Sequence, residues 1–440
     1  MSESETRTRF RVTTRFRGLR PSRRFRRWGT LLVALALLFP VGACGAGAEA
    51  VLWSLDGREV RGGGDARPTV WATGPTVGIA RARDVAGYDA ATGERRWTVP
   101  LSGEVCAVSS RPVGGRVAVR FGEERIGCHR VALIDLRAGR KVWERTITPN
   151  DPLKSGDVVI AEGVVAVDWE YSTTAFRLDD GEPLWTVDSR GEQCEIDVLS
   201  GGPVLLAGRT CENKARSVHR LDPRNGRPVW DYGVPPGYEV EAMTTTRRVV
   251  LGLGGSGRGV SRFVVLDPSG AWVAGFDVED ENSVLCHDQR DLDRCIGVVV
   301  SDDSLYARPE KRSRIRERRT VPVVSFDLST GRARWETENP DNNHLYPLAM
   351  DGARLIAAQP RKPGRGGKGN GGGTPPRLVS VDAATGRTSV MWDVPGEVSL
   401  WLGSRYGRQY AQGRLFIHET SVTRQDDDDV VFRALAEPAE

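Results

Sequence analysis

One short segment recurs along most of this 440-residue chain and restricts what the chain can fold into. Its copies end in Trp97, Trp143, Trp185 and Trp230 at intervals of 42 to 46 residues, and Phe276 continues the series. A period in the low forties, with room for several short strands in each unit, is typical of the blades of a β-propeller. The length would also accommodate two or three ordinary domains, but the repetition favours one large all-β domain.

Each repeat contains a turn signal between two expected strands. In the copy that ends at Trp143, Asp135 precedes the turn and Gly139 closes it. A carboxylate in that position can bind backbone N–H groups, and glycine tolerates a positive φ angle. The four strands expected in this copy are Val105–Ser109, Arg116–Arg120, Arg130–Asp135 and Arg140–Arg145. The repeat positions that we assign to the scaffold rather than to a site are Trp53, Asp89, Gly93, Trp97, Asp135, Gly139, Trp143, Asp179, Gly181, Trp185, Asp222, Gly226, Trp230, Asp327, Gly331, Trp335, Asp382, Gly386 and Trp392.

The pattern x-Asp-x-x-Thr-Gly-x-x-x-Trp resembles the repeat of quinoprotein alcohol dehydrogenases and of bacterial lipoproteins with a pyrroloquinoline-quinone-like (PQQ-like) propeller. That group includes a propeller lipoprotein of outer-membrane protein assembly. The resemblance extends over roughly residues 50–435 and rests on several copies of the pattern. It implies that each Trp docks onto the Gly-containing turn of the adjacent blade. A similarity of fold does not by itself transfer a function.

The strand count predicts an eight-bladed propeller that is closed by its own N-terminus. The three strands expected after Trp392 are Ser399–Gly403, Leu415–Thr420 and Val430–Leu435. The segment Ala50–Leu55 reads as one further outer strand, with Trp53 in register with the other tryptophans. Pairing it beside the last three strands would close the ring and remove the exposed sheet edges. The propeller would then occupy residues 50–435, followed by a tail at 436–440.

The first 44 residues have the three parts of an export signal. A basic segment is followed by the apolar run Thr30–Phe39 and then by small residues. The order Val41-Gly42-Ala43-Cys44 resembles a bacterial lipobox, in which the cysteine is lipidated and becomes the mature N-terminus. We therefore expect Cys44 to hold the protein at the outer face of the cell membrane through the short tether 45–49. An uncleaved membrane anchor over Gly29–Ala48 is the alternative, and a secreted protein is a third interpretation.

Charge is distributed unevenly along the chain. Residues 1–27 contain ten Arg against Glu3 and Glu5, so the rest of the chain carries a net charge of −4 although the total is +4. A body with this balance argues against a general nucleic-acid binder.

Two basic insertions are the best candidates for an interaction surface. They span Arg308–Arg319 and Arg361–Arg377, each between the second and third strands of its blade, so both should emerge on one rim of the same face. A basic rim suits anionic lipid headgroups, an anionic envelope polymer or an acidic envelope protein, whereas the alternative is two solvated loops without a role. The acidic run Asp426–Asp429 occupies the equivalent loop of the last blade, where it would be solvated, bind a cation or pair with the basic loops. The candidate interaction residues are Arg308, Lys311, Arg312, Arg314, Arg316, Arg318, Arg319, Arg361, Lys362, Arg365 and Lys368.

The six cysteines beyond Cys44 form three pairs that are close in sequence. An even number of cysteines in an exported chain predicts disulfide bonds. The expected strand register predicts the bonds Cys106–Cys128 and Cys194–Cys211, each of which would link the start of a first strand to the end of the second. We expect Cys286–Cys295 to bridge the first two strands of its own blade.

No sequence motif identifies a catalytic site. The chain lacks a Gly-x-Ser-x-Gly segment, a His-Glu-x-x-His segment and the adjacent cysteines of many quinoprotein dehydrogenases. None of its residues can be matched to the Ca²⁺ and quinone ligands of that family. The acidic residues from Asp277 to Asp293 offer oxygen ligands but lack the spacing of a known calcium loop. We therefore expect neither a metal nor a cofactor, with Ca²⁺ and PQQ as the alternative.

These features together predict an extracytoplasmic, membrane-attached propeller that serves as a binding or scaffolding module at the cell envelope. Its expected partner is an envelope protein, an anionic polymer or lipid headgroups. The alternative function is a quinone-cofactor oxidoreductase or a degenerate cofactor binder, and a ligand-sensing ectodomain is the third. The sequence predicts no particular oligomeric state.

Overall fold

The computed structural model describes most of the chain beyond residue 49. The described residues are 50–61, 68–123, 127–147, 156–169, 172–189, 194–211, 216–255, 259–278, 284, 286, 291–308, 322–337, 345–360, 376–394 and 406–437. They belong to one compact unit, Gly47–Glu440, and the remaining unit is Met1–Ala46. The expected signal sequence, Cys44 and the tether therefore lie outside the described residues. Within the described ranges, no helix is both long and apolar enough to cross a membrane.

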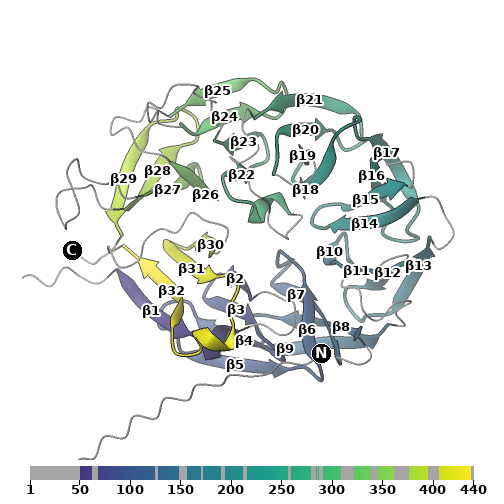
Figure 1. Ribbon diagram of the computed structural model, residues 1–440, viewed down its shortest axis with the longest axis horizontal. Coiled ribbons are helices and arrows are strands. Elements are labelled where there is room, and N and C mark those ends of the chain that lie inside the picture. The colour runs from purple at the N-terminus through teal and green to yellow at the C-terminus, as the bar shows by residue number, and fades with distance from the viewer. Residues whose placement is uncertain are drawn as a thin grey trace, which may run out of the picture. The chain divides into compact units, whose positions relative to one another are not determined.

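Eight four-stranded antiparallel sheets follow one another around a ring and form an eight-bladed propeller, as predicted (Figure 1). Blades 1 and 2 contain β2 (Thr69–Thr73), β3 (Thr76–Ala80), β4 (Asp84–Asp89) and β5 (Arg95–Pro100), then β6 (Glu104–Val108), β7 (Arg116–Glu123), β8 (Gly127–Asp135) and β9 (Arg140–Thr146). Blades 3 and 4 contain β10 (Val158–Ala161), β11 (Val164–Trp169), β12 (Ser172–Arg177) and β13 (Pro183–Asp188), then β14 (Cys194–Ser200), β15 (Leu205–Cys211), β16 (Arg216–Leu221) and β17 (Pro228–Gly233).

The second half of the ring has the same organisation. Blades 5 and 6 contain β18 (Glu239–Thr245), β19 (Val249–Gly254), β20 (Arg262–Leu266) and β21 (Trp272–Asp277), then β22 (Val298–Val300), β23 (Ser304–Ala307), β24 (Val324–Asp327) and β25 (Ala333–Glu336). Blades 7 and 8 contain β26 (Tyr346–Asp351), β27 (Arg354–Gln359), β28 (Arg377–Asp382) and β29 (Thr388–Asp393), then β30 (Tyr406–Ala411), β31 (Arg414–Glu419), β32 (Val430–Ala436) and, from the N-terminus, β1 (Val51–Asp56).

The N-terminal strand closes the ring as the sequence predicted, since β1 pairs antiparallel with β32 and forms the outer strand of blade 8. The first strand of this blade was predicted at Ser399–Gly403 and is found instead at β30. The reason is the two-residue turn Gln412–Gly413, in which both residues have positive φ angles. A turn of this kind matches the twist of a hairpin, so it sets the pairing of β30 with β31.

The acidic run of the last blade contacts the N-terminal segment. The short helix α1 (Gly57–Val60) follows β1, and its backbone N–H at Gly57 donates to the carbonyl oxygen of Asp429, 3.1 Å away. Arg58 forms an ion pair with Asp428, and Arg61 forms one with Asp427. These contacts add to the pairing of β1 with β32, so the run takes part in ring closure.

Tryptophan rings join neighbouring blades in the way that the resemblance implied. In each such pair, a Cβ atom built on the glycine would overlap the ring from the preceding blade. The pairs are Trp53–Gly93, Trp97–Gly139, Trp143–Gly181, Trp185–Gly226, Trp230–Gly270 and Trp335–Gly386. The indole N–H of Trp143 also donates to the carbonyl oxygen of Leu178, 2.9 Å away. The bulky ring and the bare glycine backbone are therefore complementary parts of one contact.

The interface between blades 5 and 6 departs from this pattern. Ala274, not Phe276, occupies the tryptophan position, because it pairs with Val265 just before the strand bulge. It lies near Gly331 of the next blade. Phe276 lies two residues farther along and stacks on Phe326, with 4.4 Å between the ring centroids. The prediction that Phe276 continues the repeat position was therefore wrong by two residues, although an aromatic contact still joins the two blades.

The aspartates of the repeat bind the turns that follow them. Asp135 Oδ1 accepts hydrogen bonds from the backbone N–H groups of Arg137 and Ala138, and Asp327, Asp382 and Asp89 do the same in their blades. In the shorter copy, Asp180 accepts the backbone N–H of Glu182, whereas the predicted Asp179 forms an ion pair with Arg116 of the preceding blade. In this turn, which is two residues shorter, the aspartate that binds the backbone is therefore one position later than predicted.

The three disulfides have the predicted pairing: Cys106–Cys128, Cys194–Cys211 and Cys286–Cys295. The location predicted for the third was wrong, since it does not bridge two strands of a blade. The first strand of blade 6 begins only at Val298, so both Cys286 and Cys295 lie in the segment that precedes it. The bond therefore closes a loop within this connecting segment, which enters the channel described below.

Candidate functional site

The first strand of each blade lies nearest the axis of the ring (Figure 1), and the region around this axis is called the channel below. Two connecting segments enter the channel. The segment before β22 forms a parallel bridge between Asp291 and Met243 of β18, and then makes the 3₁₀ turn η1 (Leu292–Arg294). The other segment is the loop between β6 and β7, which carries Ser110 and Arg111.

Arg111 joins the two segments across the channel. Its Nε lies 2.8 Å from Asp291 Oδ2, and its Nη1 lies 2.8 Å from Asp293 Oδ2. Its Nη2 donates to Thr244 Oγ1 at 2.9 Å. Ser110 donates to the same Asp291 oxygen at 2.5 Å. Blades 2 and 6 are four positions apart in a ring of eight, so this network links opposite sides of the propeller.

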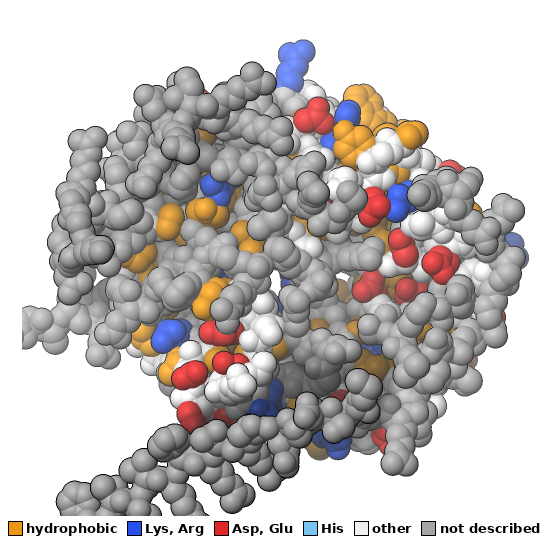
Figure 2. All heavy atoms as spheres, in the orientation of Figure 1, with side chains coloured by type: hydrophobic (Ala, Val, Ile, Leu, Met, Phe, Trp, Pro, Cys, Tyr) orange, Lys and Arg blue, Asp and Glu red, His pale blue; other side chains and the backbone are white. Residues whose placement is uncertain are grey.

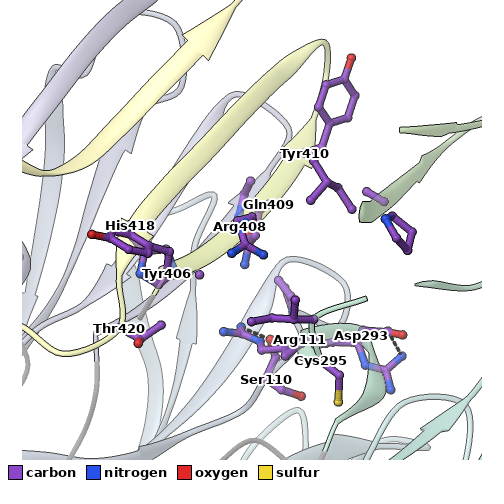
Figure 3. A pocket seen from close by; sticks show the side chains of 18 residues that line it. Ser110, Arg111, Asp293, Cys295, Tyr406, Arg408, Gln409, Tyr410, His418 and Thr420 are labelled. Atoms are coloured by element: carbon purple, nitrogen blue, oxygen red, sulfur yellow. Dashed lines mark hydrogen bonds and ion pairs between the residues drawn. The ribbon is translucent and has the colours of Figure 1, made fainter. Parts of the chain in front are cut away.

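A cavity of about 450 Å³ lies beside this network. Its walls come from the β6–β7 loop, the turn before β22, and strands β26, β30 and β31 (Figure 3). Of the charged residues in this lining, Arg111, Arg294 and Arg408 are cationic and Asp293 is acidic. The volume falls within the range of small-molecule sites, which is roughly 300–1,000 Å³.

Strands β30 and β31 form the wall opposite the network. Arg408 points from β30 into the space above Arg111 (Figure 3). His418 on β31 packs over its cross-strand neighbour Gly407, where a Cβ atom would lie 2.1 Å from Nε2. Its Nδ1 donates to the carbonyl oxygen of Glu419, 3.1 Å away. Glycine at position 407 thus leaves room for the imidazole at the edge of the pocket.

The buried cations define the electrostatics of the pocket. Burial lowers the pKa of Arg294 to about 10, although the charge of Asp291 acts in the opposite direction. Burial also lowers the pKa of Arg408 to about 10. The pKa of His418 falls to about 4, first because the ring is buried and then because Arg294 and Arg408 repel a further positive charge. The imidazole is therefore neutral at pH 7.

Asp293 shows the opposite shift. Burial raises its pKa to about 6, and the charge of Asp291 raises it further, whereas Arg111 lowers it. A third of the Asp293 side-chain surface, 34%, is exposed, and the side chain lines the pocket. Arg111 therefore favours the ionised form of Asp293 against these costs.

The comparison with protein families matches residues 127–389 to the family described as outer membrane protein assembly factor BamB. This match covers more than half of the chain. The chain belongs to this family. This family match agrees with the PQQ-like repeat inferred from the sequence. Comparison with curated protein sequences finds no match.

Two solved structures are similar to the chain but distant in sequence. BamB from Moraxella catarrhalis is 13% identical, with a TM-score of 0.48, covering 86% of this chain and 95% of that one. The quinohemoprotein alcohol dehydrogenase from Comamonas testosteroni is 13% identical, with a TM-score of 0.52, covering 92% of this chain and 78% of that one. These likenesses concern the fold alone, so the site has to be argued from this chain's own residues.

Most of the predicted basic rim lies outside the described residues. Of the candidate interaction residues, Arg308 is described, and its side chain is buried rather than exposed on a rim. Its guanidinium stacks over the ring of Tyr346, 3.7 Å from the centroid. Arg308 is thus part of the scaffold at the base of the insertion. The other ten residues, from Lys311 to Arg319 and from Arg361 to Lys368, lie in the ranges that the structure leaves undescribed.

The described channel residues do not fit a calcium-bound quinone. Asp291 and Asp293, which belonged to the acidic stretch considered for Ca²⁺, are both bound to Arg111. Across the described ranges, no group of three His, Cys, Asp or Glu side chains is placed to hold a metal ion. A Ca²⁺ ion at this point would also lie close to buried guanidinium groups.

Sequence reasoning missed the pocket residues Arg111, Arg294, Arg408 and His418. None belongs to the repeat pattern, and Arg111 lies 180 residues from the carboxylate that it binds. A local signal is present in Tyr406–Ala411, where Arg408 and Gln409 lie side by side on a first strand. Knowing that first strands face the channel would have directed attention to Arg408.

Proposed function

We propose that this chain is an exported, membrane-attached propeller that serves as a binding and scaffolding module at the cell envelope. The observation that carries this proposal is the position of the two long connections in blades 6 and 7. They run from Ala307 to Val324 and from Gln359 to Arg377, in each case between the second and third strands. Loops that a rigid scaffold holds in place are the usual carriers of binding function.

The strand order supports a shared face for these connections. Adjacent strands are antiparallel, so connections between second and third strands leave every blade at the same end. The short Asp–Gly turns between third and fourth strands leave at the opposite end. In the face shown in Figure 2, acidic side chains gather over blades 3 and 4, across the ring from the basic connections, and also over blade 8, which adjoins blade 7. A basic rim beside an acidic surface would orient an anionic partner.

Membrane attachment would hold this face near its partners. The stretch from Cys44 to Val51 spans at most about 25 Å when it is fully extended. If Cys44 is lipidated, the closing strand β1 lies within that distance of the bilayer. Replacing Cys44 by Ser should then release the protein from membranes or leave an unprocessed precursor. Normal attachment of the Cys44→Ser protein would favour the uncleaved anchor instead.

The proposed binding role can be tested with residues 45–440. Vesicles that contain anionic lipid, and envelope extracts after cross-linking, should capture this protein at low salt and lose it as ionic strength rises. Replacing the Lys and Arg residues of 309–319 and 361–368 by Ser and Gln should abolish capture while leaving the thermal unfolding midpoint unchanged. Arg308 is kept, because it packs on Tyr346. Undiminished capture by the neutral-loop protein would exclude the basic rim as the binding surface.

A further inference from the structure

The pocket in the channel carries more positive than negative charge. Three arginines and one aspartate line it, and a second aspartate, Asp291, lies behind Arg111. When all of these groups are ionised, one positive charge remains among them.

His418 lies beside the same arginines. Its imidazole is buried and repelled by Arg294 and Arg408, and it contributes no compensating charge at neutral pH. Burial is the main reason that the imidazole stays neutral, so the guanidinium groups of Arg294 and Arg408 are the groups that would attract an anion here. The low local dielectric strengthens that attraction, because less water is present to screen it.

The lining also matches an organic ligand rather than a bare ion. Hydroxyl groups of Ser110, Tyr406 and Thr420 accompany the guanidinium groups. Apolar surface comes from Ile296, Leu348 and Pro112. Pockets that combine a few polar groups with apolar walls use the former for orientation and the latter for most of the contact area.

We propose that the channel pocket binds a small organic carboxylate, held by the guanidinium of Arg408 and packed against Leu348 and Ile296. A planar carboxylate matches the forked donors of arginine. Inorganic phosphate has no apolar part to pack against Leu348 and Ile296. The inference goes beyond the proposed envelope function. It requires neither membrane attachment nor a partner bound to the face that carries the two long connections of blades 6 and 7.

Binding can be measured by calorimetry on residues 45–440 with hexanoate and benzoate as probes. Hexanamide and benzamide have nearly the same shape without the charge, and inorganic phosphate tests the anion alone. We expect both carboxylates to bind at least ten-fold more tightly than their amides and more tightly than phosphate. Equal binding of acids and amides, tighter binding of phosphate, or no binding of either acid would overturn the proposal. This comparison uses the unaltered pocket and does not depend on any variant.

Two variants locate the site. Arg408→Gln should weaken carboxylate binding at least ten-fold, whereas Arg433→Gln on β32 of the same blade, outside the pocket lining, should leave it unchanged. If Arg408→Gln does not fold by circular dichroism, Arg408→Lys keeps the charge but loses the fork and should still weaken binding. Unchanged affinity in the folded Arg408 variant would overturn the assignment.

A bound carboxylate could belong to a small free acid or to the C-terminus of a protein chain, and a further comparison separates these two sources. A tripeptide with a free C-terminus and the same peptide as its amide test a protein chain end. Binding of the free peptide no tighter than that of hexanoate supports the small acid. Binding of the free peptide alone would overturn the small-acid assignment in favour of a chain end.

Discussion

Arg111 and Asp291 form an ion pair across the channel of the propeller, with 2.8 Å between Nε and Oδ2. They connect the loop of blade 2 to the segment that precedes blade 6. Only 9% of the Asp291 side-chain surface is exposed. The ring is therefore held in two ways, by the closing strand β1 at its circumference and by this network through its centre.

Removing the Arg111 guanidinium should destabilise the fold. Arg111→Ala would leave the buried Asp291 and its neighbour Asp293 without their shared cation, and a buried charge that loses its partner typically costs about 3–5 kcal/mol. Urea unfolding of residues 45–440 measures the change in the free energy of unfolding. The same substitution in an Asp291→Asn, Asp293→Asn background should cost at least about 1 kcal/mol less, because the charges are gone.

The control for this prediction is Arg116→Ala. Arg116 also pairs with an aspartate of another blade, but 82% of the side-chain surface of that residue, Asp179, is exposed. Exposed pairs contribute about 0–1 kcal/mol, so this variant should change stability little. An Arg111→Ala protein as stable as the Arg116→Ala protein would show that the channel network does not stabilise the ring.

The Trp–Gly contact between blades gives a second prediction, with a matched pair of glycines. Gly139 has a φ angle of 62°, and a Cβ atom there would lie 2.3 Å from Cγ of Trp97. Gly114 has a φ angle of 60°, but a Cβ atom there would have no neighbour within 4 Å. Both Ala variants incur the cost of a left-handed backbone, about 1–2 kcal/mol. Gly139→Ala must also displace Trp97, so we expect it to lose about 2 kcal/mol more in thermal or urea unfolding. Equal losses of stability in the two variants would mean that the indole ring of Trp97 moves aside without cost.

The parts of the fold that sequence predicted are those with local signals. The Asp–Gly turns and the tryptophan spacing lie within single repeats, so the blades and the closing strand could be identified from neighbouring residues. Ala274 and Phe276 could not be distinguished, because the choice depends on a strand bulge with no sequence signature. The turn Gln412–Gly413 was missed because glutamine rarely adopts a positive φ angle.

The site was harder to predict than the fold for a physical reason. Arg111 and Asp291 meet only because opposite blades face one channel, so their contact is a property of the closed ring. Arg408 and His418 come from a hairpin whose first strand was predicted at the wrong residues. The disulfide Cys286–Cys295 was paired correctly since its cysteines are near in sequence, but its place in the channel segment depends on where β22 begins.

The residues in the channel also predict the response to PQQ. Arg111 already forms ion pairs with Asp291 and Asp293. We therefore expect Ca²⁺ not to increase the affinity of residues 45–440 for PQQ in calorimetric and absorbance titrations. Any binding of the quinone should depend on its carboxylates and should weaken with salt. Stoichiometric binding at micromolar or lower concentration that requires Ca²⁺ would instead support the oxidoreductase alternative and justify a screen of alcohol substrates.

The pH dependence of stability tests the environment of His418. Its pKa is about 4 in the folded protein and near 6.5 when unfolded. Between these values the unfolded state binds a proton that the folded state does not, so stability falls as pH decreases from about 6.5 to about 4. His418→Phe keeps a ring of similar size and removes this titration. The stability of the unaltered protein relative to this variant should therefore fall by up to about 3 kcal/mol across that range.

Asp293 must be included in the same measurement, because its contribution has the opposite sign. Its pKa is raised from 3.8 to about 6, so the folded state binds the extra proton between these values and stability rises as pH decreases. Urea unfolding at pH 4.0, 5.0, 6.0 and 7.0 should be compared for the unaltered protein, His418→Phe, Asp293→Asn and the double variant. In the Asp293→Asn background the loss of stability on acidification should be steeper, and adding His418→Phe should reduce it. If His418→Phe leaves the pH profile unchanged in both backgrounds, the pKa of His418 does not change on folding, and the low pKa assigned to the buried imidazole is wrong.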